Sequence, residues 1–125
     1  MKNAVNWFEI PVTDYQRAKT FYQTILDIEI TDMPMPEESV EYGFFPHDME
    51  NQGVGGAIMR MDKMIPSKDG STVYLNGGDD LSVVLNKVEP AGGQLFIAKM
   101  GIGENGFIAQ FIDTEGNRVA LHSKN

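Results

Sequence analysis

Residues 5–26 read VNWFEIPVTDYQRAKTFYQTIL and combine a strand pattern with a helix pattern. β-forming side chains dominate residues 5–12, and Pro11, which has no N–H to donate, suits the end of a strand. Thr13 and Asp14 form a good helix N-cap, and apolar residues then recur at helical spacing. The segment therefore predicts a strand followed by a helix from Tyr15 to Leu26.

The same order of elements occurs twice along the chain, which indicates an internal repeat. A shift of 66 residues lays Asp14 on Asp80, so both expected helices begin at an acidic residue. The expected elements are strands at 5–12, 28–33, 41–45 and 54–61 around the first helix, and strands at 72–75, 94–98, 106–112 and 118–122 around a second helix that starts at 79–80. The pattern predicts one α+β domain over residues 1–125, with module one at about 4–61 and module two at about 71–123.

Each module pairs one helix with four strands, and one helix covers only one face of such a sheet. The other face must pack on something else or border a cavity. Two such modules, placed side by side in one chain or exchanged between two chains, would curl into an incomplete barrel around that space. The architecture therefore predicts a small-molecule cavity.

The composition excludes several classes of protein. The chain has no cysteine, which rules out disulfides, thiolate catalysis and zinc–sulfur sites. With 18 acidic against 10 basic residues its net charge is −8, so we expect neither nucleic acid nor an anionic membrane as a partner. No apolar run approaches the ~20 residues of a membrane helix, and residues 1–7 show no secretory signal. The expected partner is a small molecule and the expected location is the cytoplasm.

Four segments carry a resemblance to a known family, namely Trp7–Asp14, Arg17–Tyr22, Ala91–Gly93 and Phe111–Asn117. In this order they resemble the vicinal oxygen chelate superfamily, which contains glyoxalase I, bleomycin-resistance proteins, fosfomycin-resistance enzymes and extradiol dioxygenases. The Trp-Phe-Glu-Ile-Pro opening is most similar to small bacterial glyoxalase-like proteins of undefined activity. The resemblance spans essentially the whole chain and implies a glyoxalase-like fold, in which two βαβββ modules form an incomplete barrel around a cavity.

The resemblance also implies where a divalent metal would be bound. In metal-using members the first-strand ligand lies seven residues before the helix-capping Asp, which gives Trp7 in module one and Val73 in module two, with Thr72 as the neighbouring possibility. The last-strand ligand is a Glu three or four residues after the Gly-Asn turn, where Ala120 stands. The side chains of Trp7, Val73 and Ala120 have no donor for such a cation, so we expect no metal cofactor.

Glu9 and His122 are the candidate catalytic residues. Strand alternation places each of them on the same face as a position where a metal ligand is missing, two residues away: Glu9 beside Trp7, and His122 beside Ala120. Three interpretations are open. The two side chains form a hydrogen-bonded or rim-exposed polar pair, they act on a bound ligand as an acid–base pair, or they hold a displaced metal together with Gln110 or His47. The third falls short of the three protein ligands that a catalytic metal usually has.

The expected ligand-binding residues are Trp7, Glu9, Phe44, Tyr74, Gln110, Ala120 and His122. Among them, the Trp7 indole offers a stacking plane for an aromatic or cationic ligand. The favoured function is a glyoxalase/bleomycin-resistance-like protein that binds a small organic molecule, cationic or aromatic, in a metal-free pocket.

Other functions are open at this point. The chain could be a lyase, isomerase or dioxygenase of the same superfamily, either metal-free through Glu9 and His122 or metal-dependent with displaced ligands, so whether it is an enzyme is undecided. It could also act only through a protein partner. We expect a homodimer, because small members of this group commonly pair and C2 symmetry is the commonest assembly.

Overall fold

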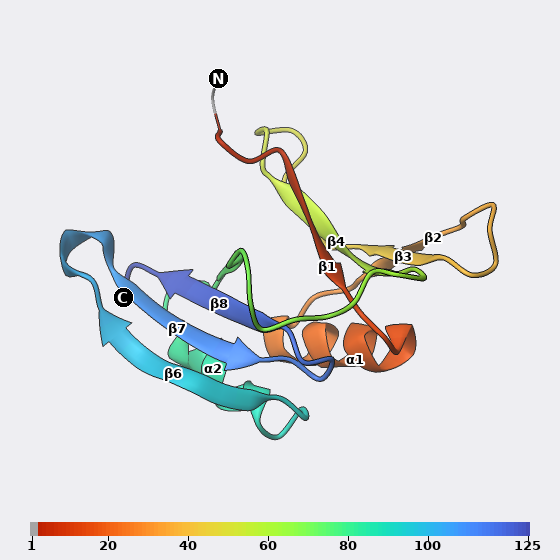
Figure 1. Ribbon diagram of the computed structural model, residues 1–125. Helices are drawn as coiled ribbons and strands as arrows, with labels where there is room; N and C mark the ends of the chain where they lie inside the picture. The colour runs from red at the N-terminus through yellow and green to blue at the C-terminus, as the bar shows by residue number, and fades with distance from the viewer. Residues whose placement is uncertain (1–2) are drawn as a thin grey trace.

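A computed structural model describes residues 3–125 and shows two four-stranded sheets with two helices (Figure 1). Module one builds the first sheet and module two builds the second. Each module has the order strand, helix and three strands, with one short helical turn added in module two. The predicted α+β architecture with two βαβββ modules is confirmed, and the two sheets of one chain do not close into a barrel.

Module one consists of β1 (Trp7–Pro11), α1 (Tyr15–Leu26), β2 (Thr31–Met33), β3 (Glu41–Phe44) and β4 (Gly55–Arg60). The strands lie in the order β1-β4-β3-β2, with β1 parallel to β4 and the other pairs antiparallel. α1 has the predicted bounds, and the Asp14 carboxylate caps it by accepting the Arg17 backbone N–H at 3.1 Å. The apolar face predicted for this helix is buried.

Module two consists of β5 (Tyr74–Asn76), α2 (Ser82–Val88), β6 (Gln94–Gly101), a 3-10 turn η1 (Gly103–Asn105), β7 (Phe107–Ile112) and β8 (Arg118–Ser123). The strands lie in the order β5-β8-β7-β6, again with one parallel pair, β5 and β8. α2 begins at Ser82 rather than at the predicted 79–80, and its N-cap Leu81 makes no side-chain capping bond, although Asp80 accepts the Ser82 backbone N–H at 2.9 Å. No helix within residues 3–125 is long and apolar enough to span a membrane.

Some strand ends differ from the predicted ones. β2 begins at Thr31 rather than at residue 28, because the Gln23 side-chain oxygen accepts the Ile30 backbone N–H at 2.9 Å and ties the approach to this strand to α1. β5 covers Tyr74–Asn76 rather than 72–75, and η1 was not predicted at all. These shifts stay within a few residues and leave the order of elements unchanged.

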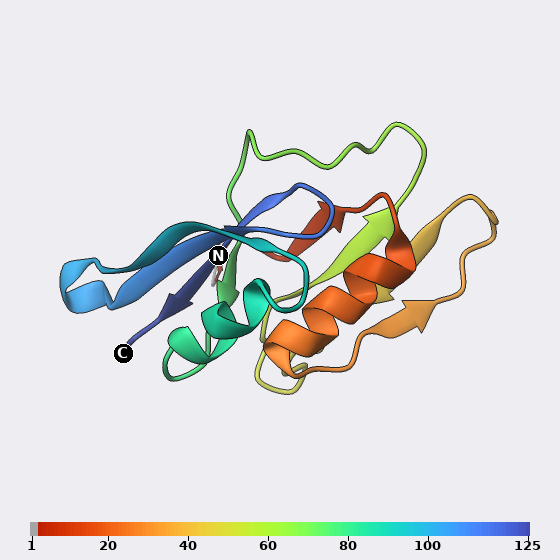
Figure 2. The same ribbon diagram turned by 90° about the horizontal axis from the view of Figure 1, so that it is seen from below.

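Both helices lie on the same side of the molecule (Figure 2). α1 packs on α2, and one continuous apolar core joins residues of both helices to residues of both sheets. Phe21 of α1, for example, contacts Phe111 of β7 with ring centroids 5.9 Å apart. Each sheet therefore turns one face to this shared core, and its other face, called the open face below, is not covered by a helix.

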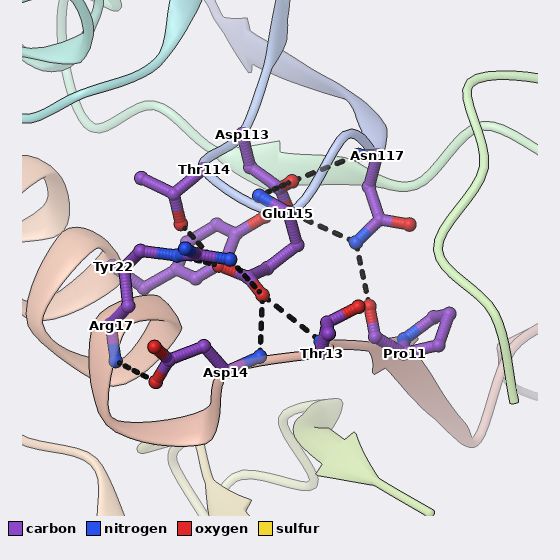
Figure 3. A network of polar contacts seen from close by, with 9 residues as sticks. All are labelled: Pro11, Thr13, Asp14, Arg17, Tyr22, Asp113, Thr114, Glu115 and Asn117. Carbon is purple, nitrogen blue, oxygen red and sulfur yellow. Dashed lines mark hydrogen bonds and ion pairs between the residues drawn. The ribbon is translucent and has the colours of Figure 1, made fainter. Parts of the chain in front are cut away.

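A buried polar network holds the two modules together (Figure 3). Its centre is Asp113, which is only 4% exposed and follows β7. The carboxylate accepts hydrogen bonds from the Tyr22 hydroxyl of α1 at 2.6 Å, from the Glu115 backbone N–H at 2.8 Å, and from the backbone and side-chain N–H groups of Asn117 at 2.9 and 3.0 Å. Asn117 also donates to the Pro11 carbonyl of β1 at 2.7 Å.

Glu115 adds a second layer to this inter-module network. Its carboxylate accepts the backbone N–H groups of Thr13 and Asp14 at 2.9 and 2.7 Å, and it pairs with the Arg17 guanidinium at 2.7 Å. A residue of module two therefore satisfies backbone donors just before the helix of module one. The Asp113–Asn117 segment, whose residues carry part of the family resemblance, is the joint between the modules.

Candidate functional site

The open face of the first sheet carries three of the predicted ligand-binding residues. Phe8 and Ile10 pack against the core, so alternation along β1 turns Trp7 and Glu9 to the open face. Glu9 pairs through Ala57 of β4 with Phe44 of β3, which places Phe44 on this face as well. The structure thus brings Trp7, Glu9 and Phe44 together, and Trp7 and Glu9 share a face as strand alternation predicted.

Tyr42 of β3 connects Trp7 to Glu9 and was not predicted. The Trp7 indole N–H donates to the Tyr42 hydroxyl at 2.9 Å, and this hydroxyl donates to Glu9 Oε2 at 2.7 Å. The second carboxylate oxygen, Oε1, accepts no hydrogen bond from the part of the chain that the structure describes. Because Glu9 is exposed, that oxygen is available to a ligand.

The protonation state of Tyr42 follows from its surroundings. Partial burial raises the pKa of the phenol, and the hydrogen bond to the Glu9 carboxylate raises it further, while the bond from Trp7 opposes the shift. The hydroxyl is therefore protonated at neutral pH and donates to Glu9. It fixes the position of the carboxylate and does not act as a base.

Aromatic rings surround this hydrogen-bonded chain. The Trp7 ring meets those of Phe44 and His47 edge to face, with centroids 5.7 and 5.8 Å away, and Tyr42 meets Phe44 in the same way at 5.5 Å. Gly55 of β4 makes this arrangement possible, because a Cβ there would collide with the His47 ring. We call Trp7, Glu9, Tyr42, Phe44 and His47 the aromatic–carboxylate cluster.

The open face of the second sheet carries the other predicted residues. Tyr74, Ala120 and Gln110 lie in one row across β5, β8 and β7, and His122 lies two residues further along β8. Ala120 is fully buried within this row, whereas Tyr74 is 48% exposed. Tyr74 and His122 line a cavity of about 860 Å³.

The structure does not bring Glu9 and His122 together within one chain. Glu9 lines a small cavity beside Arg118, at the start of β8, whereas His122 lies near the end of that strand and lines a different cavity. Four residues of extended chain separate Arg118 from His122, about 13 Å along β8. His122 Nε2 lies 2.7 Å from the Asn105 carbonyl oxygen. Since a carbonyl only accepts, Nε2 carries a proton and Nδ1 is the nitrogen left for a ligand.

Arg118 is a second residue of this face that the sequence did not single out. Its guanidinium donates to the Lys68 and Gly70 carbonyls at 2.8 and 3.2 Å, to the Thr72 hydroxyl at 2.5 Å and to the Gln110 side chain at 3.2 Å. It thereby holds the connector between the modules against β8. A lone arginine after a turn gives no sequence signal for this role, because the accepting carbonyls come from residues about fifty positions away.

The position of Val73 corrects one prediction. Val73 packs against the core, whereas Thr72 contacts Arg118, which shares its face with Ala120. The module-two equivalent of Trp7 is therefore Thr72. The repeat shift is 65 residues in the strand and 66 in the helix, because Asp80 lies eight positions after Thr72 whereas Asp14 lies seven positions after Trp7.

The residues present do not fit the divalent metal that the resemblance implies. An indole, a threonine hydroxyl and a methyl group stand at the positions of Trp7, Thr72 and Ala120, and none is a strong ligand for such a cation. Within residues 3–125 no three His, Cys, Asp or Glu side chains are grouped so that they could hold a metal ion. No chemical step is therefore derived through a metal.

Comparison with known proteins identifies the family. The sequence model of the glyoxalase/bleomycin resistance protein/dioxygenase superfamily matches residues 4–121. The chain belongs to this superfamily.

Some of the similar proteins are about twice as long as this chain, and others have about the same length. CFP32, a candidate glyoxylase of Mycobacterium tuberculosis, is 28% identical over 124 residues, which cover 96% of this chain but 45% of the relative. A point variant of glyoxalase I from Zea mays superposes with a TM-score of 0.73 at 20% identity, over 94% of this chain and 45% of that one. The fosfomycin resistance protein FosX of Listeria monocytogenes gives 0.68 at 14% identity, with 100% and 94% covered. This chain thus spans about half the length of CFP32, and the structural likenesses show the fold alone.

Proposed function

We propose that this protein binds a small organic molecule, cationic or aromatic, on the open face of the first sheet without a metal. The aromatic–carboxylate cluster is the observation that carries this proposal. Three aromatic rings and an imidazole border a carboxylate that Tyr42 holds in place and that keeps one oxygen free. A cation is attracted both by the faces of such rings and by the carboxylate.

The proposed pocket uses no metal, because the donors at the inherited positions are the wrong ones. Glu9 and His122, the nearest other donors, line different cavities within one chain. The net charge of −8 also favours cationic over anionic ligands. The lack of cysteine agrees with a cytoplasmic location, which we propose as well.

A homodimer would complete the pocket. The two open faces of one chain lie side by side above a shared core, so they cannot cover each other. In a C2 pair the first sheet of one chain would face the second sheet of its partner. The length of CFP32 supports this, because the part that this chain does not match is long enough for a second unit. Tyr74, Gln110, Ala120 and His122 of the partner would then line the same pocket as Trp7 and Glu9.

Trp7 allows a direct test, because it is the only tryptophan of the sequence. Titration with phenyltrimethylammonium should quench or shift its fluorescence in a saturable way, and neutral benzyl alcohol should bind at least threefold more weakly. Glu9→Gln should remove most of this preference for the cation. Equal binding of both probes, or no saturable change with either, would contradict the proposal. Sedimentation of a particle of the chain's own mass, 13.9 kDa, would contradict the dimer.

The metal is tested separately. Elemental analysis of protein purified without a chelator or a histidine tag should find well under one divalent ion per chain. Thermal unfolding should not shift when divalent cations are added, whereas a site saturated at a hundredfold excess over Kd would add about 2.7 kcal/mol. One bound ion per chain would instead support a metal-dependent lyase, isomerase or dioxygenase with displaced ligands.

A metal-free enzyme is the second candidate function. The observation that favours it is the tautomer of His122, whose free Nδ1 could accept a proton once the partner's open face brings a ligand close. If Glu9 and His122 act as a pair, Glu9→Gln and His122→Ala should each abolish turnover of an oxygenated substrate while binding persists. Unchanged turnover in either variant would exclude this function.

A further inference from the structure

A groove of about 640 Å³ lies between the modules and borders the cavity on the open face of the second sheet, with which it shares Leu75, Asn76 and Gly78. Its lining residues come from the C-terminal end of α1 and the two residues after it, 25–28, and from the loop after β5 together with α2, a helix that lies beside the end of α1 in Figure 2. The open-face residues Trp7, Glu9, Tyr42 and His122 do not line it. The groove is therefore a candidate site of its own, and its volume is typical of a small-molecule pocket.

The groove has an apolar floor. Phe8, Leu26, Phe45, Leu75, Val83 and Val84 contribute to its lining. Val83 is 61% exposed although its neighbours on α2 at positions 84 and 88 are buried in the core. Exposed apolar surface within a concave site favours a ligand with an apolar body.

The rim of the groove is negatively charged. Asp27, Asp79 and Asp80 stand against one cation, Lys87, among the lining residues. Asp80 is paired with Lys99 at 2.8 Å, whereas the carboxylates of Asp27 and Asp79 form no ion pair within residues 3–125. The last turn of α1 contains no basic residue, so the negative end of its dipole is also uncompensated. A ligand that matches this rim carries a positive charge.

From this charge pattern and floor we infer that the groove binds an aliphatic amine, with its ammonium group at Asp27 and Asp79 and its alkyl chain on the floor. Most of the floor is aliphatic, which distinguishes it from the ring-lined cluster on the open face. The inference is independent of the proposed function, because the two sites share no charged residue.

The test uses hexylammonium and neutral 1-hexanol on the full chain, with binding followed by amide chemical shifts in two-dimensional NMR. Hexylammonium should shift the amides of Leu26, Asp27, Asp79 and Val83 in a saturable way and should bind at least threefold more tightly than 1-hexanol. Asp79→Asn should weaken hexylammonium at least threefold and leave 1-hexanol unchanged. Asp69→Asn, which changes an exposed carboxylate of the connector, is the matched control and should have no effect.

Three outcomes would overturn the inference: no saturable shift at the groove, equal affinity of the two probes, or the same affinity in Asp79→Asn. If a second copy of the chain covers the groove, no saturable shift will be seen there. Trp7→Ala protein distinguishes the two sites, since it should bind hexylammonium normally even if it no longer binds phenyltrimethylammonium. Loss of hexylammonium binding in Trp7→Ala would place the amine on the open face and would also overturn the inference.

Discussion

The two polar networks of this protein are built from similar groups but stand in opposite environments. In the inter-module network a buried carboxylate, Asp113, accepts four hydrogen bonds, one of them from a tyrosine hydroxyl. In the aromatic–carboxylate cluster an exposed carboxylate, Glu9, also accepts a bond from a tyrosine hydroxyl, but one of its oxygens is left open. A saturated, buried network stabilises a fold, whereas an unsaturated one on an uncovered face is free to bind.

The pKa shifts of these groups express the same contrast. Burial raises the pKa of Asp113, although the bonds from Tyr22 and Asn117 favour its charged form. Burial likewise raises the pKa of Tyr22 well above its ordinary value, so its hydroxyl stays a donor. In the cluster, partial burial and the bond to Glu9 raise the pKa of Tyr42, so this hydroxyl is also a donor.

Asp113→Ala should have the largest effect. It leaves the Tyr22 hydroxyl and the Asn117 amide unpaired in the core, so the free energy of unfolding should fall by about 3 kcal/mol. Urea unfolding measures this. Asp48→Ala removes a carboxylate that accepts hydrogen bonds from Asn51 in an exposed turn, and should cost less than about 1 kcal/mol. A similar cost for both variants would mean that the buried Asp113 contributes no more to stability than a carboxylate in an exposed turn.

Trp7→Ala should affect binding more than stability. The side chain is 37% exposed, so its loss should change the free energy of unfolding by about 1 kcal/mol or less. The affinity for phenyltrimethylammonium, measured by calorimetry, should fall about tenfold, equivalent to 1.4 kcal/mol. Phe96→Ala, which removes a 53% exposed ring on β6, is the control and should leave the affinity unchanged. An unaltered affinity in Trp7→Ala would show that the cluster is not the binding site.

Glu115→Gln should make the free energy of unfolding less dependent on pH in the acid range. Burial acts to raise the pKa of Glu115, but the bonds from Arg17 and from backbone N–H groups outweigh it and hold the pKa below the ordinary 4.5. A lowered folded-state pKa adds stability above the ordinary value, and this stability is lost as the pH falls through the folded value.

The wild-type chain should therefore lose about 1 kcal/mol from this residue between about pH 5 and 3, a loss that Glu115→Gln should lack. Urea unfolding at a series of pH values measures the two curves. If the free energy of unfolding falls equally with pH in the wild type and in Glu115→Gln, Glu115 does not join the modules in solution.

Tyr42→Phe should have the smallest effect on stability, about 0.5 kcal/mol, because its hydroxyl lies at the edge of an exposed site. It removes the hydrogen bond between Trp7 and the Tyr42 hydroxyl, so the fluorescence maximum of Trp7 should shift. The affinity for phenyltrimethylammonium should fall about threefold, since Glu9 is no longer held in place. Emission identical to the wild type would contradict the observed contact.

Much of the fold could be predicted because its signals are local. The bounds of α1 follow from the Asp14 cap and from apolar residues at helical spacing, and the repeat follows from the same signals around Asp80. The face of Val73 could not be predicted, since one extra residue between Thr72 and Asp80 reverses the side to which a strand residue points. Placing Trp7 and Glu9 on one face was local and succeeded, whereas Tyr42 was missed because it lies 35 and 33 positions away from them.

By itself, the sequence determined the two-module architecture and the bounds of α1, because these depend on residue types at short spacings. Only the tertiary structure decided that Tyr42 joins Trp7 to Glu9, that Glu9 and His122 lie apart in one chain, and that a groove opens between α1 and α2. These features arise where segments distant in the sequence meet, and the packing of both helices into one core fixes how they meet.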